Sequence, residues 1–192
     1  TTADATTAVV APSGEAVPTS PALTAASVDA DRLSAVFLSA FTSDECEHIL
    51  RWARELAERN ASATSYDARY AGGEGEPWVS RSYVRAALPA WALQRVQDYV
   101  AAADGALWRL ISPADYVEEP IVSSYARVGE RPADRFDWHV DWSVEQAMAD
   151  ATGRHLAVSV QLSAPSTYCG GTLTVGPRDI PRDQGALCVF PA

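Results

Sequence analysis

An alternating segment of the chain carries the residues best suited to chemistry. In RFDWHVDW, residues 135–142, Asp137, His139 and Asp141 alternate with large apolar side chains. Successive side chains of a β-strand point to opposite faces, so the pattern predicts a strand with one buried apolar face and one polar face. We expect the His139 imidazole and the Asp141 carboxylate to share a side, roughly 6–7 Å apart at the backbone, where both can reach one metal ion. The apolar face consists of Phe136, Trp138, Val140 and Trp142.

The spacing of His139 and Asp141 suits a mononuclear iron centre. One histidine and one carboxylate, completed by a second histidine, form the facial triad of non-haem Fe(II) oxygenases. Three protein ligands leave one face of an octahedral ion open for an oxo-acid co-substrate and dioxygen. A His-x-Asp pair that merely faces water is the alternative. Asp137 shares this face, and we expect it to form a salt bridge with an arginine or, alternatively, to orient an imidazole.

Composition narrows the classes of function that remain. The 192-residue chain is 47% hydrophobic with a net charge of −10, so it can bury one sizeable core and offers little attraction to nucleic acid. It contains no lysine, which excludes a lysine Schiff base and a P-loop lysine. No apolar run approaches the roughly 20 residues that cross a bilayer, and no secretory signal is visible. Three widely spaced cysteines suit a reducing compartment, so we expect a cytoplasmic protein with no membrane partner.

The N-terminal part divides into a tail and a helix. Residues 1–30 are rich in Ala, Thr, Pro and Ser and predict a disordered tail, whereas residues 31–192 form the folded domain. After a short strand, a helix begins at the capping-box pair Thr42 and Glu45, and Asn60 is suited to end it. The apolar stripe of this helix consists of Cys46, Ile49, Leu50, Ala53, Leu56 and Ala57.

The remaining elements are a second helix and a run of strands. A glycine-rich loop, YAGGEGEPW, precedes a possible strand, and a helix follows from about Pro89 to Ala103, with Gly105 past its end. From Pro120 onward, short alternating segments are separated by turn residues, as in a β-sandwich or barrel. These segments are IVSSYARV, RFDWHVDW, HLAVSVQLSA, GGTLTVG and GALCVFPA. The order predicts an α+β domain in which helices precede an antiparallel β-barrel or jelly roll.

Several of these motifs, taken in order, resemble one known family. SSYARVGERPADRFDWHVDW, RHLAVSVQLSAPSTYCGGTLTV and GALCVFPA are similar to the prolyl 4-hydroxylase-like branch of the Fe(II)/2-oxoglutarate oxygenases, and the resemblance runs from about Asp31 to the last residue. It implies a double-stranded β-helix of the jelly-roll kind, with N-terminal helices that buttress one sheet. It also implies that His139 and Asp141 are iron ligands and that Tyr125 donates a hydrogen bond to 2-oxoglutarate.

Two residues are candidates for contact with the co-substrate. Gln161 alternates with apolar neighbours, so it shares a strand face with Ser159 and Ser163 and either lines the cavity or faces solvent. Within the resemblance, we expect Tyr125 and Gln161 to contact 2-oxoglutarate. A tyrosine packed in the core is the alternative for Tyr125.

The family pattern continues beyond the motifs present here. Relatives carry a distal histidine soon after the VFP strand and, somewhat later, an Arg or Lys that holds the far carboxylate of 2-oxoglutarate. The chain ends at Ala192, before both, so we expect a domain that is incomplete at its C-terminus, with the terminal strands missing. His155 is the internal candidate for a third ligand, although its place at the start of a strand favours a surface or strand-edge histidine.

These observations predict a dioxygenase that depends on Fe(II) and 2-oxoglutarate. It would hydroxylate a C–H bond of a peptidyl, prolyl-type substrate or of a small molecule, and ascorbate would serve as an accessory reductant. The alternative is a jelly-roll binding module with a degenerate metal site, or an inactive truncated remnant. A zinc hydrolase is a weaker third hypothesis, because the sequence contains no HExxH or comparable motif. The sequence does not predict the oligomeric state.

Overall fold

The computed structural model describes residues 27–28, 33–70, 77–85, 88–111, 118–126, 134–141 and 154–192. Within these residues the chain is a mixed α+β protein with two α-helices and several antiparallel sheets. Neither of the described helices is long and apolar enough to cross a membrane. The helical elements are α1 (Ser43–Arg59), η1 (Ala61–Ala63), α2 (Ala90–Leu107) and η2 (Pro165–Thr167).

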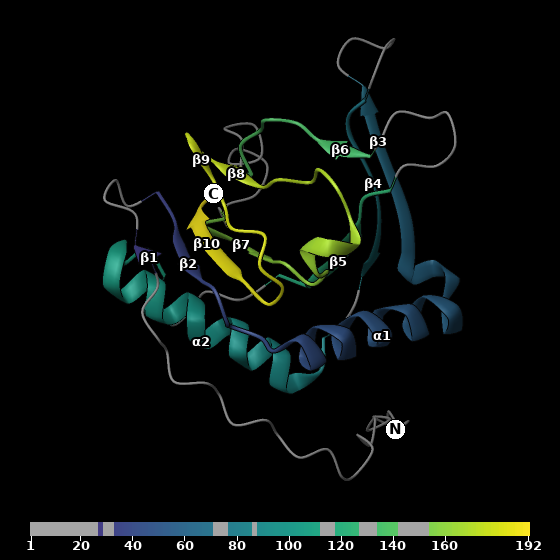
Figure 1. Cartoon of the computed structure of the whole chain (residues 1–192), viewed down its shortest axis with the longest axis horizontal. Coiled ribbons are helices and arrows are strands. Elements are labelled where there is room, and N and C mark those ends of the chain that lie inside the picture. The colour runs from purple at the N-terminus through teal and green to yellow at the C-terminus, as the bar shows by residue number, and fades with distance from the viewer. Residues whose placement is uncertain are drawn as a thin grey trace, which may run out of the picture.

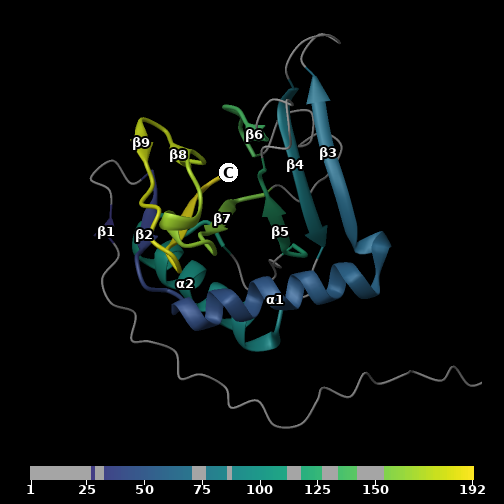
Figure 2. The ribbon, with the colours of Figure 1, turned by 45° about the vertical axis from the view of Figure 1, so that its right-hand side comes forward.

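The described strands form two larger sheets and a small hairpin, and every pairing among them is antiparallel. Sheet A has the order β1 (Ser27–Val28), β2 (Ala35–Phe37), β10 (Leu187–Pro191) and β7 (Leu156–Val160). Sheet B contains β3 (Thr64–Tyr70), β4 (Pro77–Arg85), β5 (Ile121–Ser124) and β6 (Arg135–Phe136), with β5 and β6 both paired to β4. The hairpin consists of β8 (Thr174–Val175) and β9 (Arg178–Asp179). In Figures 1 and 2 the two helices run beneath both sheets, with α2 under sheet A.

Helix α1 begins and ends where its sequence predicts. The Thr42 hydroxyl accepts a hydrogen bond from the Glu45 backbone N–H, the Glu45 carboxylate accepts one from the Thr42 N–H, and Asn60 is the C-cap. The capping box is therefore confirmed. Three members of the expected stripe, Cys46, Ile49 and Ala53, are buried and face the core. Burial raises the pKa of the Cys46 thiol to about 11, so this cysteine serves as an apolar core residue rather than as a nucleophile.

The main core lies between sheet A and the two helices. Ala35, Phe37, Leu187 and Val189 supply the sheet side of this core, and α2 contributes Tyr99, whose ring lies 4.6 Å from that of Phe37. The opposite face of sheet A packs on the β8–β9 hairpin through a smaller cluster of Val36, Ile180 and Cys188. Both faces of sheet A are thus covered.

A buried ion pair joins the start of α1 to α2. The Arg95 guanidinium is 3% exposed, and its Nη1 donates to Glu45 Oε2 over 2.6 Å. Arg95 also lies against the rings of Phe41 and Trp91. Burial on its own raises the pKa of Glu45, but the hydrogen bonds from Arg95 and from the Thr42 N–H, with the Arg95 charge, outweigh burial, and the net pKa is lowered. The same carboxylate therefore both caps α1 and neutralises a charge inside the core.

Away from the candidate site, the structure differs from the sequence expectations at three places. Gly105 lies inside α2, which continues to Leu107 rather than ending before it. The strand β3 was not foreseen, although TSYDARY shows the two-residue alternation of a strand. Ser27–Val28, within the expected tail, form β1; residues 1–26 and 29–30 lie outside the described residues.

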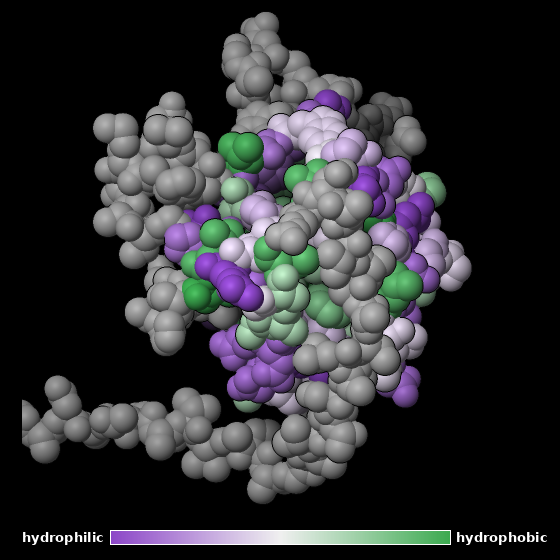
Figure 3. All heavy atoms as spheres, turned by 90° about the vertical axis from the view of Figure 1, so that its left-hand side faces the viewer, coloured by the Kyte–Doolittle hydropathy of each residue, from purple (hydrophilic) through white to green (hydrophobic). Residues whose placement is uncertain are grey.

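On the face shown in Figure 3, hydrophobic and hydrophilic residues are interspersed. Among the described residues on this face, neither kind forms one continuous area in the view.

Candidate metal centre

Strand β6 is shorter than the alternating pattern predicts. It pairs with β4 through Val79↔Phe136 and Ser80↔Arg135 and ends at Phe136, and residues 137–141 form bends and irregular backbone. A hydrogen-bonded neighbour maintains the pleat of a strand, so the alternation lapses where the pairing stops. The expected strand is therefore wrong from residue 137 to 141. Trp142 lies outside the described residues.

The side chains of this segment are distributed differently from the expectation. Trp138 is 73% exposed and Val140 is 71% exposed, so their predicted burial is wrong. The Phe136 ring stacks on the His139 imidazole, with centroids 3.8 Å apart and planes at 7°. Because the chain bends after Phe136, these two residues share one side instead of lying on opposite faces.

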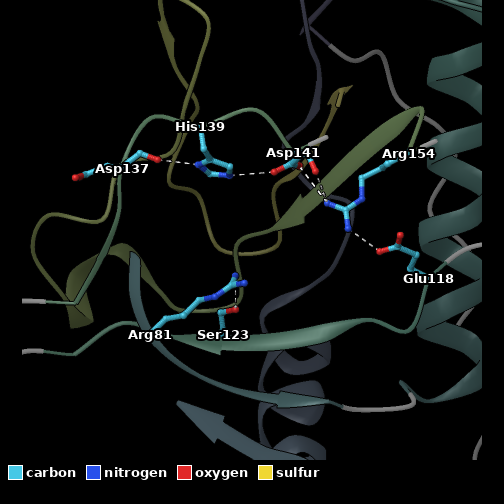
Figure 4. Close-up of polar contacts among 7 residues, drawn as sticks. All are labelled: Arg81, Glu118, Ser123, Asp137, His139, Asp141 and Arg154. Atoms are coloured by element: carbon cyan, nitrogen blue, oxygen red, sulfur yellow. Dashed lines mark hydrogen bonds and ion pairs between the residues drawn. The ribbon is translucent and has the colours of Figure 1, made fainter. Parts of the chain in front are cut away.

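The His139 imidazole and the Asp141 carboxylate nevertheless converge. His139 Nε2 lies 3.0 Å from Asp141 Oδ1, and the two side chains are 29% and 21% exposed. On the other side of the ring, Nδ1 lies 2.7 Å from the backbone oxygen of Asp137. Figure 4 shows the imidazole held between these two oxygens. The sequence expectation that the two groups point to one place agrees with this geometry, although a bend rather than a strand produces it.

Both oxygens that face the imidazole are hydrogen-bond acceptors. A neutral imidazole carries one N–H, so it can donate to the Asp137 carbonyl or to the Asp141 carboxylate, but not to both. If Nδ1–H donates to the carbonyl, the Nε2 lone pair faces the Asp141 oxygen. In that tautomer the two lone pairs repel each other unless a metal ion, or a proton on one of the two groups, lies between them.

The distance within the pair also suits a metal ion. Two ligand atoms bonded to one ion at about 2.1 Å and at a right angle lie roughly 3.0 Å apart. His139 Nε2 and Asp141 Oδ1 have this separation of 3.0 Å. The backbone carbonyl on Nδ1 is the type of outer partner that fixes the tautomer of a ligating histidine. The two residues therefore fit as neighbouring ligands of one ion.

Two arginines hold the acidic groups around the pair. Arg154 donates to Glu118 over 2.7 Å and to the Asp141 backbone oxygen over 3.4 Å, and it lies 3.9 Å from Asp141 Oδ2. Figure 4 shows Arg154 bridging these two acids. Arg135 pairs with the Asp137 carboxylate over 3.1 Å, so the predicted salt bridge of Asp137 with an arginine is confirmed. The role of Arg154 was not foreseen, because Glu118 and Asp141 meet it only through the fold.

The described residues do not supply a third ligand. His155 is exposed directly before β7, and its backbone oxygen accepts a hydrogen bond from the Ala192 N–H, which confirms the expected strand-edge position. Within the described ranges, no group of three or more His, Cys, Asp or Glu side chains is placed to hold a metal ion. The pair of His139 and Asp141 is therefore the candidate centre.

Tyr125 and Gln161 lie elsewhere on the sheets. Tyr125 follows β5 directly and is 47% exposed. Gln161 follows β7, donates its side-chain amide to the Ser163 backbone oxygen, and lines a cavity of about 30 Å³ beside the β8–β9 hairpin. Ser159 lines the same cavity, as the alternation predicts, whereas His139 and Asp141 do not. Among the described interactions, neither Tyr125 nor Gln161 contacts the pair.

Comparison with known proteins assigns the chain to no family. No protein-family model, no curated protein and no solved structure matches the chain.

Proposed function

We propose that this protein is an Fe(II)- and 2-oxoglutarate-dependent dioxygenase that hydroxylates a C–H bond of a peptidyl, prolyl-type substrate or of a small molecule. The observation that carries the proposal is the 3.0 Å approach of His139 Nε2 to Asp141 Oδ1, with Nδ1 held by a backbone carbonyl. Bound Fe(II) would supply the site for dioxygen and the oxo-acid. One oxygen atom goes to the substrate, and the other goes to succinate as 2-oxoglutarate loses carbon dioxide. Ascorbate is proposed as an accessory reductant.

We also propose that the two sheets belong to a double-stranded β-helix. Antiparallel sheets A and B stand above the two helices in Figures 1 and 2, and the helices pack on one face of sheet A. A jelly roll is built from two such antiparallel sheets. The His139–Asp141 pair follows β6 of sheet B, and Arg154, two residues before β7 of sheet A, contacts Asp141. This arrangement supports the fold proposal.

The residues around the pair have distinct roles in this proposal. The Asp137 carbonyl holds the Nδ1 proton, so Nε2 remains a lone-pair donor to the ion. Arg154 faces Asp141 Oδ2 at 3.9 Å, which leaves Oδ1 directed at His139. Phe136 covers one face of the imidazole and excludes water from it. Tyr125 and Gln161 are proposed contacts for 2-oxoglutarate, which requires the co-substrate to extend toward both sheets.

Turnover of 2-oxoglutarate tests this function. With Fe(II), oxygen and ascorbate, we expect the purified protein to release succinate, and we expect Asp141→Asn to lower the rate by at least about 100-fold, because an amide oxygen is a weak iron ligand. Glu118→Gln is the matched control, since it changes an acid that lies on Arg154 and not on the ion. Succinate release that is equal in Asp141→Asn and wild type would contradict the proposal. Metal binding without any succinate release would favour a non-catalytic binding module.

A further inference from the structure

The Arg81 guanidinium on sheet B lies near the candidate centre. Arg81 is half-buried on β4, and the strand register places it on the same sheet face as Tyr83, Ser123 and Phe136. Its Cζ lies 4.8 Å from the Phe136 ring and 5.5 Å from the Tyr83 ring. Phe136 in turn stacks on His139 at 3.8 Å. Arg81 and the imidazole thus both lie against the Phe136 ring.

Within the described residues, the charge of Arg81 lacks a carboxylate partner. Its Nη1 makes one long hydrogen bond, 3.4 Å, to the Ser123 hydroxyl, and its buried Nε has no hydrogen-bond partner. Arg95 also has a buried Nε without a partner, but its charge is neutralised by Glu45 at 2.6 Å. A charged group held among rings without a counter-charge is costly, so such a group signals a missing partner.

We infer that Arg81 receives a carboxylate of the small organic acid that binds at the His139–Asp141 centre. In Figure 4 the Arg81 guanidinium and Ser123 are drawn in the lower part of the view, and His139 and Asp141 in the upper part. One guanidinium and one hydroxyl match the single charge of a carboxylate, whereas a phosphate dianion calls for more donors. A carboxylate that accepts hydrogen bonds from the terminal nitrogens of Arg81 neutralises the positive charge, which is delocalised over the whole guanidinium including Nε. This inference rests on the proposed function and names the ligand class of that site.

Binding of a plain dicarboxylate to the metal-free protein tests the inference apart from the enzyme activity. We expect succinate, titrated by calorimetry, to bind the wild type and to bind Arg81→Met about 10–100-fold more weakly, the usual effect of losing one charged hydrogen-bonded pair. Arg85→Met is the matched control, because Arg85 is on the same strand and over the same Tyr83 ring at 5.7 Å, but pairs with Glu119 at 4.0 Å. Its affinity is expected to equal that of the wild type.

Two further experiments identify which ligand supplies the carboxylate and separate a loss of binding from misfolding. Arg81→Lys keeps the positive charge but loses the two parallel N–H donors of the guanidinium. It should therefore bind succinate with an affinity between those of wild type and Arg81→Met. With Mn(II) bound, 2-oxoglutarate is compared with 2-oxopentanoate, which lacks the far carboxylate. If Arg81→Met removes the preference for 2-oxoglutarate over 2-oxopentanoate, Arg81 binds the co-substrate. If that preference persists while the affinity for succinate falls, Arg81 binds the carboxylate of the substrate. Equal succinate affinity in wild type, Arg81→Met and Arg81→Lys would overturn the inference even if the protein binds metal and turns over 2-oxoglutarate.

Discussion

Gly185→Ala is expected to destabilise the fold by more than about 3 kcal/mol. Gly185 has a φ of +84°, and a Cβ built on it would lie 1.9 Å from the Phe41 backbone oxygen. Its N–H donates to the Gln161 oxygen over 2.7 Å, and its oxygen accepts from the Phe41 N–H over 3.1 Å. The contact atoms belong to the backbone, so no side-chain rotation relieves the clash. The substitution must separate the start of β10 from the segment that precedes α1.

Gly105→Ala is the control for this experiment. Gly105 lies within α2, and a Cβ there would meet nothing within 4 Å. Alanine is favoured over glycine in a helix interior, so we expect a gain of about 0.5–1 kcal/mol. Urea unfolding, monitored by circular dichroism, measures the free energy of unfolding of both variants and of the wild type. A stability of Gly185→Ala within about 0.5 kcal/mol of the wild type would show that the close approach to Phe41 is wrong.

Glu45→Gln is expected to destabilise the protein by about 3 kcal/mol, because it leaves the Arg95 charge buried without a counter-charge. Arg95 is 3% exposed and lies 2.6 Å from the Glu45 carboxylate. Glutamine still suits the third helical position of a capping box, so the loss reports the charge rather than the helix cap. Denaturant unfolding at neutral pH gives the difference in the free energy of unfolding between Glu45→Gln and the wild type.

A second variant and a pH series separate this effect from simple loss of packing. Adding Arg95→Met to Glu45→Gln removes the buried charge, so we expect the double variant to recover a large part of the stability. Glu55→Gln is the exposed control, since the Arg59–Glu55 pair spans 3.8 Å with side chains 66% and 53% exposed, and we expect a loss below about 0.5 kcal/mol. The folded-state pKa of Glu45 is lowered from 4.5, so its contribution is complete above pH 4.5 and is lost as the pH falls through the lowered pKa. A double variant less stable than Glu45→Gln would contradict this account.

Local signals in the sequence predicted the helical frame well. Thr42, Glu45 and Asn60 define the ends of α1 because capping depends on residues within one turn of each other. The stripe at Cys46, Ile49 and Ala53 follows from the 3.6-residue period alone. Likewise, the continuous apolar run of β10 follows from its burial by the layers on both faces of sheet A.

Features that depend on distant partners were not predictable. Trp138 and Val140 look like core residues, yet β6 ends before them because β4 pairs with it only through Val79 and Ser80 within the described residues. Arg95 is charged and long, and its burial depends on Glu45, which lies on another helix. Arg81 and Arg154 gain significance only when the fold brings Phe136 and Asp141 beside them. The convergence of His139 with Asp141 could be foreseen because the two residues are close in sequence, whereas the bend that achieves it could not.

Titration with Mn(II), an air-stable substitute for Fe(II), tests most directly whether the imidazole and carboxylate form a metal centre. Calorimetry or electron paramagnetic resonance on the purified chain should give one bound ion per chain. We expect this binding to be lost in His139→Ala and in Asp141→Asn and to persist in His155→Ala, since His155 is exposed at the edge of β7. Absence of binding to the wild type, or binding that survives loss of the His139 imidazole, would contradict the account.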